Sequence, residues 1–236
     1  MKGKPRGHKP PGGPAGPRTA SPGPRTASPG PRTASPGSPA SADRIVGFRA
    51  GLAVLGARPA DVLRIGCARE AIAEVERVLS ARPSGVEEPA ISVLPPQELE
   101  RLARSPQHEG LVLEARPRRW LGPAELADLL SGKAGVAVAL DRVRNSYNIG
   151  AILRSAAFFG ADAVLLGAPA PHPGLDPNAV RVAEGGAEHL ALSRTTDLGD
   201  TLSRLRARGV RVYGADGHSD ASAVGYPFAR PCVLVL

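Results

Sequence analysis

Cysteine and aromatic residues are scarce in this chain of 236 residues. The two cysteines, Cys67 and Cys232, lack the spacing of a disulfide framework or of a zinc site. Aromatic residues make up 3% of the sequence, so a core must consist mainly of Val, Leu, Ile and Ala, which the hydrophobic content of 42% allows. These scarcities exclude a disulfide-stabilised or zinc-stabilised fold. They indicate a reducing compartment, and we expect a cytoplasmic protein.

Long apolar runs are also lacking. No run approaches the ~18 residues that a membrane-spanning helix needs, so we expect no membrane partner. The N-terminus is basic but has no apolar segment of the kind found in secretory signals. Its Arg- and Ser-containing, acid-free composition faintly resembles an organelle transit peptide. Its proline density opposes the amphipathic helix that such peptides form.

Acidic residues are absent from residues 1–42, which hold seven of the 30 lysines and arginines and eleven of the 25 prolines. The motif GPRTASP occurs there three times, starting at Gly16, Gly23 and Gly30. Such a segment cannot bury enough apolar surface to offset its chain entropy, so we predict a disordered tail. It is either a solvated linker or an arm that binds phosphates irrespective of sequence. The remaining chain is nearly neutral, which makes a weak electrostatic case for nucleic-acid binding.

Residues 43–120 show strands alternating with helices, which predicts a small α/β domain. In the segment 69–82, Val75 and Leu79 lie on one helical face while Glu74 and Arg77 point outward. The segments concerned are strands at 61–67, 91–94 and 110–116, and helices at 47–56, 69–82 and 95–105. A further helix at 123–133 leads to the next part of the chain.

Residues 135–236 predict an open, parallel α/β sheet. The runs GVAVALDRV and ADAVLLG are almost continuously apolar, as expected for parallel strands covered on both faces, and a helix at 149–160 separates them. The segments that follow are a short helix within 179–189, a strand at 190–194, a helix at 198–209 and strands at 210–216 and 231–236. Sheets of this kind bind ligands beyond the carboxyl ends of their strands.

A polar cluster, NSYNIGAILR, follows the first of these strands. Asn148 is placed to cap the helix, and Gly150 allows backbone or a ligand to approach closely. Arg154 lies further along the same helix. From spacing alone, it is equally well a surface residue whose stem lies along apolar neighbours. No G-x-G-x-x-G motif follows the strand, and SGKAG lacks the residues of a phosphate-binding loop.

The stretch from Leu140 to Gly167 resembles the first signature motif of the SpoU (TrmH) family of RNA 2′-O-ribose methyltransferases. That motif is an apolar strand, N-x-G-x-x-x-R, a helix of small residues, the dipeptide FG and a second strand. The matching residues are Asn148, Gly150, Arg154, Phe159, Gly160, Ala161 and Asp162. The segment AVRVAEGGAEHL (179–190) resembles the family's next characteristic stretch. SPQHEGLVLEARP (105–117) resembles the end of a preceding substrate-binding domain. The resemblance covers roughly residues 44–236.

The resemblance implies methyl transfer from S-adenosylmethionine to a ribose 2′-hydroxyl of tRNA or rRNA. A SPOUT-like (α/β knot) methyltransferase domain at 135–236 would follow an RNA substrate-binding domain at 43–120. A sulfonium is already an activated donor, so no metal is needed. The requirements are in-line placement and stabilisation of the hydroxyl as it loses its proton. Arg154 would hold the neighbouring phosphate and the developing alkoxide, and the high pKa of guanidinium groups in general disfavours a role as the base. Asn148 would orient the loop or the ribose.

The resemblance also implies where the cofactor binds. Of three cofactor loops in the family, the first falls here on Gly214, Ala215 and Asp216. In the family, a strand like 231–236 is followed by a G-x-E-x-x-G loop and later by Ser-Leu-Asn, which form most of the pocket and the knot. We therefore expect this chain to be an enzyme truncated before those motifs. The alternative is a non-catalytic RNA-binding protein that has lost the cofactor half. Reading the coding DNA past Leu236 distinguishes the two.

Other candidates are less specific. His108 is expected either to contact RNA or to stabilise the turn before a strand. Glu184, Glu188 and His189 lie in the region of the family's second stretch, with solvation or strand capping as the alternative for each. A homodimer is expected if the complete knotted domain is present.

Overall fold

The computed structural model describes residues 42–167 and 175–236. The predicted tail, apart from Ala42, lies outside the described residues, as does most of the proline-rich loop expected at 169–177. All the described residues belong to one compact unit, Ala40–Leu236. Within that unit the strands form two separate sheets, of four and five strands.

The four-stranded sheet is mixed and has the order β1-β4-β2-β3. β4 pairs antiparallel with both β1 and β2, whereas β2 and β3 are parallel. Alternate residues of β4 point to opposite faces: Leu111 and Leu113 pack with α1 and α2, and Val112 packs with α3. The elements are β1 (Asp43–Val46), α1 (Phe48–Ala57), β2 (Val62–Cys67), α2 (Ile72–Ser80), β3 (Ala90–Val93), α3 (Pro96–Ala103) and β4 (Leu111–Ala115).

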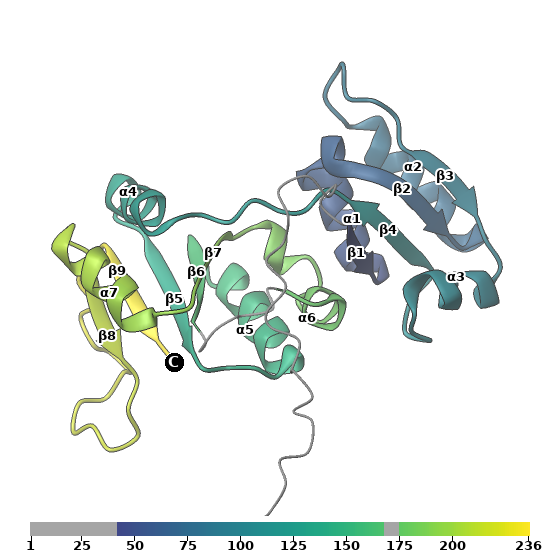
Figure 1. The fold of residues 1–236 in the computed structure, drawn as a ribbon. Coiled ribbons are helices and arrows are strands. Elements are labelled where there is room, and N and C mark those ends of the chain that lie inside the picture. Colours follow the sequence, from purple (N-terminus) through teal and green to yellow (C-terminus); the bar gives the residue numbers. More distant parts are fainter. Residues whose placement is uncertain (1–41, 168–174) are drawn as a thin grey trace, which may run out of the picture. The chain divides into compact units, whose positions relative to one another are not determined.

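The five-stranded sheet is entirely parallel and has the order β7-β6-β5-β9-β8. Its elements are α4 (Pro123–Lys133), β5 (Val136–Asp141), α5 (Ser146–Phe158), β6 (Ala163–Gly167), α6 (Pro177–Val182), β7 (Ala191–Thr195), α7 (Leu198–Ala207), β8 (Arg211–Gly214) and β9 (Cys232–Val235). The α/β fold with a parallel sheet, predicted from the apolar runs, is confirmed (Figure 1).

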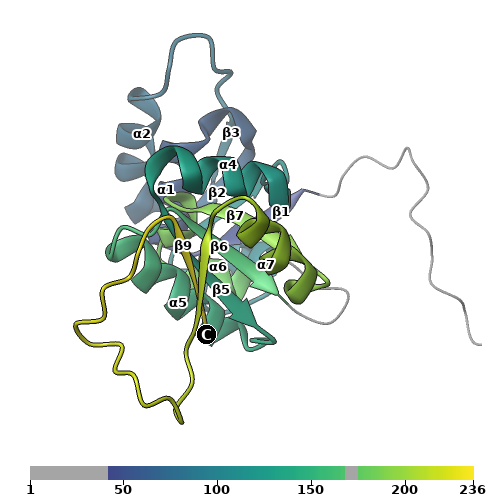
Figure 2. The ribbon, with the colours of Figure 1, turned by 90° about the vertical axis from the view of Figure 1, so that its left-hand side faces the viewer.

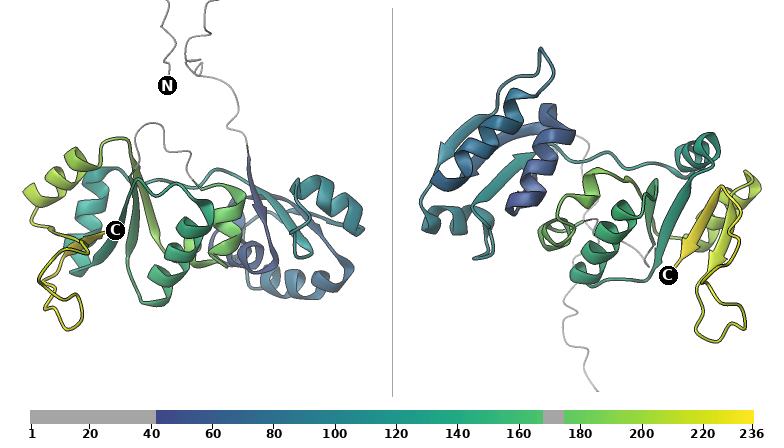
Figure 3. Two further views of the ribbon diagram at one scale, coloured as in Figure 1. Left: turned by 90° about the horizontal axis from the view of Figure 1, so that it is seen from below. Right: turned by 180° about the vertical axis from the view of Figure 1, so that it is seen from behind.

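Two apolar layers cover this sheet. Leu165 on β6 packs with α4 and α7, whereas its neighbours Val164 and Leu166 pack with α5 and α6. Figure 3 shows the two pairs of helices on opposite sides of the strands. Between β8 and β9 the chain makes a long excursion away from the sheet (Figure 2). All five residues of β6 are buried, which explains its continuous apolar run.

Two details differ from the sequence-based expectation. β1 was not predicted, because two of its four residues, Asp43 and Arg44, are charged and leave no apolar run. Helix α5 begins at Ser146, three residues earlier than expected. Its cap is Asn145, whose side chain accepts hydrogen bonds from the backbone N–H groups of Tyr147 and Asn148. The prediction that Asn148 caps this helix is therefore wrong.

Candidate active site

The carboxyl ends of all five parallel strands meet at one edge of the sheet. The connections β5 to β6 and β6 to β7 run in one direction, and the chain then crosses back so that β9 pairs with β5. Past the end of the ladder, the N–H of Asp141 donates to the carbonyl of Leu236 at 2.9 Å, and the N–H of Ala215 donates to the carbonyl of Val235 at 2.9 Å. The crevice at such a change of direction is where open α/β sheets bind ligands.

The polar segment of the sequence motif lies at this edge. Asn145 holds the first turn of α5 through N–H groups at 2.9 and 3.3 Å from its Oδ1, and Asn148 stands exposed beside it. Gly150 is buried against α6: a Cβ there would stand 2.6 Å from the carbonyl oxygen of Ala179. The glycine therefore permits close packing of two helices rather than approach of a ligand.

Arg154 lies on the same helix and faces the turn that follows α6. Its Nη1 donates to Oε1 of Glu184 at 2.9 Å. The other carboxylate oxygen of Glu184 accepts from Nη1 of Arg49 on α1, at 2.8 Å. The Arg154 side chain is 56% exposed and that of Glu184 is 32% exposed. The carboxylate of Glu184 thus connects α1, beside the four-stranded sheet, with α5, beside the five-stranded sheet. More than half of the Arg154 side chain remains exposed to solvent.

Two glycines bring the turn after α6 close to α1 and to α5. Gly185 has a φ of +91°, and a Cβ there would stand 2.7 Å from the Cβ of Ala53 on α1. A Cβ on Gly186 would stand 3.0 Å from the Cα of Arg154 and 3.1 Å from the carbonyl oxygen of Leu153. The pair of glycines in AEGGAEH is therefore explained by close packing on both sides of the turn.

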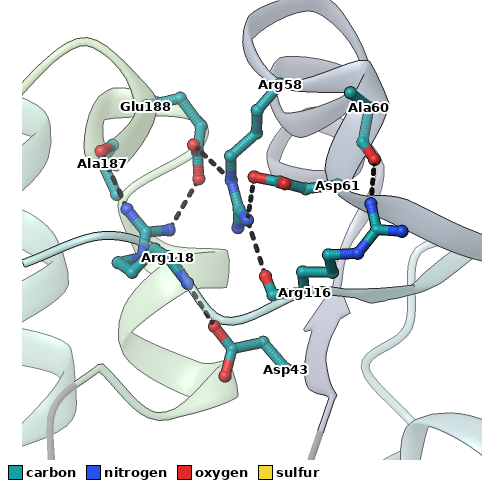
Figure 4. Close-up of polar contacts among 8 residues, drawn as sticks. All are labelled: Asp43, Arg58, Ala60, Asp61, Arg116, Arg118, Ala187 and Glu188. Atoms are coloured by element: carbon teal, nitrogen blue, oxygen red, sulfur yellow. Dashed lines mark hydrogen bonds and ion pairs between the residues drawn. The ribbon is translucent and has the colours of Figure 1, made fainter. Parts of the chain in front are cut away.

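Glu188, from the same turn, is bound by two arginines (Figure 4). Its Oε1 accepts from Nη2 of Arg118 at 2.6 Å, and its Oε2 accepts from Nε of Arg58 at 3.1 Å. The side chains are largely buried, at 5% exposure for Glu188 and 9% for Arg118. Nearby, Asp61 pairs with Arg58, and Asp43 accepts from the backbone N–H of Arg118. Sequence analysis gave solvation or strand capping as the alternative for Glu188, but the structure shows a buried ion pair.

His108 lies in the turn before β4, where its Nδ1 accepts from the N–H of Gly110 at 3.1 Å. This contact matches the turn interpretation. Contact with RNA stays a prediction.

The loop after β8 lines a cavity of about 580 Å³. Its wall includes Gly214, Ala215 and Asp216, together with a cluster of three aromatic rings from Tyr213, Tyr226 and Phe228. Hydrogen bonds from the backbone N–H and then from the ring of His218 lower the pKa of Asp216. The lining also includes Ser219 and Ser222, so it offers polar groups beside the aromatic rings. Cofactor binding by Gly214, Ala215 and Asp216 stays a prediction.

Arg154 lies on α5, whereas the cavity is lined by β8 and the loop that follows it. Among residues 42–167 and 175–236, no hydrogen bond or ion pair joins Arg154 to the segment Gly214–Asp216. Those residues also contain no group of His, Cys, Asp and Glu that could hold a metal ion. No helix in the described part of the chain is long and apolar enough to cross a bilayer.

Residues 135–236 match the model of the SpoU rRNA Methylase family. These residues form a SpoU methylase family domain. An uncharacterized tRNA/rRNA methyltransferase of Mycobacterium avium is 31% identical over 180 residues, which are 75% of this chain and 57% of that protein. The 23S rRNA (guanosine-2′-O-)-methyltransferase RlmB of Pseudomonas aeruginosa is 35% identical over 131 residues, 55% of this chain and 52% of RlmB. The chain thus spans little more than half the length of these relatives.

Solved structures show the same fold at lower identity. The SpoU methyltransferase AviRb of Streptomyces viridochromogenes, in complex with AdoMet, superimposes with a TM-score of 0.63 at 22% identity. The alignment covers 83% of this chain and 73% of AviRb. Because the match extends well outside residues 135–236, both sheets of this chain contribute to the likeness.

Sequence reasoning found Arg154 and the turn at 184–188 but not what connects them. The partners of Glu184 and Glu188 include Arg49 and Arg58, more than 100 residues away along the chain. No local pattern encodes such pairs. The only available signal was the pair of glutamates in AEGGAEH, whose small residues are otherwise buried.

Proposed function

We propose that the protein transfers a methyl group from S-adenosylmethionine to a ribose 2′-hydroxyl of tRNA or rRNA. The observation that carries the proposal is Arg154 on α5, more than half exposed although bound to a carboxylate, within a SpoU domain. RlmB, a relative over 131 residues, is named for this reaction on 23S rRNA. S-adenosylmethionine supplies an activated methyl group, which leaves the protein two tasks: positioning and charge stabilisation.

Arg154 suits the second task. A guanidinium has five N–H donors in a planar fork. Glu184 uses Nη1, which leaves donors for a phosphate and for the 2′-oxygen as its proton leaves. Asn148, exposed near the start of the same helix, is placed to orient the ribose or the loop. We assign cofactor binding to Gly214, Ala215 and Asp216, and RNA contact to Arg154 and His108.

The proposal also covers the roles of the two parts of the chain and the oligomeric state. Residues 43–120 would bind RNA, residues 135–236 would carry the reaction, and the protein would act in the cytoplasm. A homodimer is supported by an apolar surface at the end of α5, where Phe158 and Phe159 are 83% and 82% exposed. Phe159 lines a groove together with Ile152, Leu234 and Leu236. Light scattering of the purified protein tests the dimer.

A labelling experiment tests the reaction. The full natural gene product is incubated with methyl-labelled S-adenosylmethionine and separately with total tRNA and rRNA, and the RNA is then hydrolysed with alkali. Alkaline cleavage needs a free 2′-hydroxyl, so a 2′-O-methyl group leaves the label in alkali-resistant dinucleotides. Label in mononucleotides would place the methyl group on a base and contradict the proposal. RNA binding without any labelling would favour the alternative, a non-catalytic RNA-binding protein.

A further inference from the structure

We infer that Glu184 is a positioning residue. Its carboxylate binds both Arg154 and Arg49 on α1, and this contact orders the Arg154 side chain for the reaction. The inference rests on the proposed function, because it concerns the reaction in which Arg154 takes part. It adds a residue outside the N-x-G-x-x-x-R motif, supplied by the turn between α6 and β7.

The geometry of Glu184 supports this role. Its two carboxylate oxygens are divided between two arginines, Oε1 to Arg154 at 2.9 Å and Oε2 to Arg49 at 2.8 Å. A carboxylate held on both sides has little rotational freedom left. A long arginine side chain that is more than half exposed would otherwise sample many rotamers.

The backbone also holds Glu184 in place. Its φ is +46°, a left-handed conformation that non-glycine residues adopt infrequently, and Gly185 follows at +91°. The N–H of Glu184 donates to the carbonyl of Arg181 at 3.0 Å. Gly186 then packs against the Cα of Arg154 itself. The turn therefore touches the Arg154 backbone and side chain together, which fixes the direction from which the carboxylate approaches the guanidinium.

The same contact must oppose RNA binding. A phosphate that approaches Arg154 or Arg49 meets guanidinium charge already balanced in part by Glu184. Removing the carboxylate charge should therefore tighten RNA binding, and it should disorder Arg154 and slow the reaction. Opposite changes in affinity and turnover distinguish a positioning residue from one that only stabilises the fold, whose loss weakens both.

The test uses Glu184→Gln, which keeps the shape and removes the charge, and Glu184→Ala, which removes the contact. The expected turnover at saturating RNA and cofactor falls about three- to tenfold, the range for the ordering of one rotamer-rich side chain, with the larger loss for alanine. RNA affinity at low salt should rise roughly two- to fivefold, with a slope of log affinity against log salt steeper by up to about 0.9. Thermal unfolding of both variants checks that the fold is retained.

Glu109→Gln is the matched control. Glu109 is also an exposed carboxylate with two partners, Arg181 at 3.4 Å and the N–H of Phe48 at 3.2 Å, and it does not contact Arg154. Its loss changes the net charge by the same amount, so a small gain in RNA affinity is expected without a loss of turnover.

An independent readout is the order of the Arg154 side chain. In protein labelled with ¹⁵N-arginine, the Nε–H signal that disappears in Arg154→Lys is the signal of Arg154. Its heteronuclear NOE should fall in both Glu184 variants and stay unchanged in Glu109→Gln. This measurement needs neither cofactor nor turnover.

The outcomes separate the two proposals. If the wild-type protein transfers no methyl group, the proposed function fails, while the NOE still decides whether Glu184 orders Arg154. If the wild type is active and Glu184→Gln turns over equally fast or faster, the positioning role is overturned. An unchanged Arg154 signal in both Glu184 variants overturns it as well.

Discussion

Glu184 and Glu188 lie four residues apart in one turn, and each binds two arginines, yet their surroundings differ. Glu188 is 5% exposed and is bound between two side chains that are themselves mostly buried. Glu184 is 32% exposed, and its partners Arg49 and Arg154 are 70% and 56% exposed. Burial makes a charge pair costly to break, whereas exposure leaves donors free for a substrate. We therefore assign Glu188 to stability and Glu184 to the site.

Both carboxylates connect the same two parts of the chain. Arg49 lies on α1, Arg58 directly follows it, and Arg118 lies in the segment after β4. The turn belongs to the SpoU domain. Glu188 holds the turn against Arg58 and Arg118, and Glu184, in the same turn, holds the side chain of Arg154. The two roles are separable by mutation, because no hydrogen bond between described residues joins the Glu188 group to the Glu184 group.

The largest expected effect is that of Glu188→Gln. The substitution leaves the guanidinium of Arg118 buried against a neutral amide, while Arg58 keeps its longer ion pair with Asp61 at 3.4 Å. Breaking a buried pair in this way typically costs ~3–5 kcal/mol. Urea unfolding followed by circular dichroism should show this loss in the free energy of unfolding. A cost below about 1 kcal/mol would mean that the group behaves as a surface pair.

Gly186→Ala should have an intermediate effect. The new Cβ would stand 3.0 Å from the Cα of Arg154 and 3.1 Å from a backbone oxygen, so a helix or the turn must shift. Overpacking of this kind typically costs ~1–3 kcal/mol. Gly132→Ala is the control, because nothing lies within 4 Å of the Cβ position there, within α4. Gly132 lies in the last turn of α4 and its φ is not positive, so alanine there should stabilise by roughly 0.4–1 kcal/mol. Equal changes in the two variants would contradict the close packing of the turn.

The smallest effect on stability is expected from Glu184→Gln. An exposed ion pair contributes ~0–1 kcal/mol, and salt screens it. The unfolding free energies of wild type and variant should differ by less than about 1 kcal/mol at low salt and converge near 1 M salt. The difference caused by Glu188→Gln should survive the same salt, because its charges are largely out of contact with water. Similar salt dependence for the two variants would remove the distinction between the two carboxylates.

The sequence predicted the fold better than it predicted the site. Apolar runs and helical periodicity placed the strands of the parallel sheet and the helices between them, because these patterns follow directly from burial on one or two faces. The start of α5 was misplaced because Asn145 and Asn148 are both acceptable caps, and only the backbone geometry decides between them. β1 was not predicted because it forms by pairing with β4, which is distant in the sequence, and its own composition has no strand pattern.

Arg154 itself was predicted from its motif, and its role stays a proposal. The sequence did not reveal that Glu184, 30 residues away, is the partner of Arg154. It also did not reveal that Arg49, 135 residues from Glu184, binds the same carboxylate. Contacts between side chains so far apart depend on the packing of whole layers. A short motif reveals which residues are present at a site but not which charges balance them.

The most direct test of the account is the turnover of Arg154→Lys at saturating cofactor and RNA, measured beside Arg204→Lys. Arg204 is an exposed arginine on α7 that pairs with Asp200, so lysine should serve there equally well. Lysine at position 154 keeps the charge but loses the planar fork that holds a phosphate and a hydroxyl together. The account predicts a loss of ~10²–10³-fold for Arg154→Lys, with cofactor affinity retained. An Arg154→Lys protein that keeps more than about a third of wild-type turnover would contradict it, because so small a loss lies far outside that range.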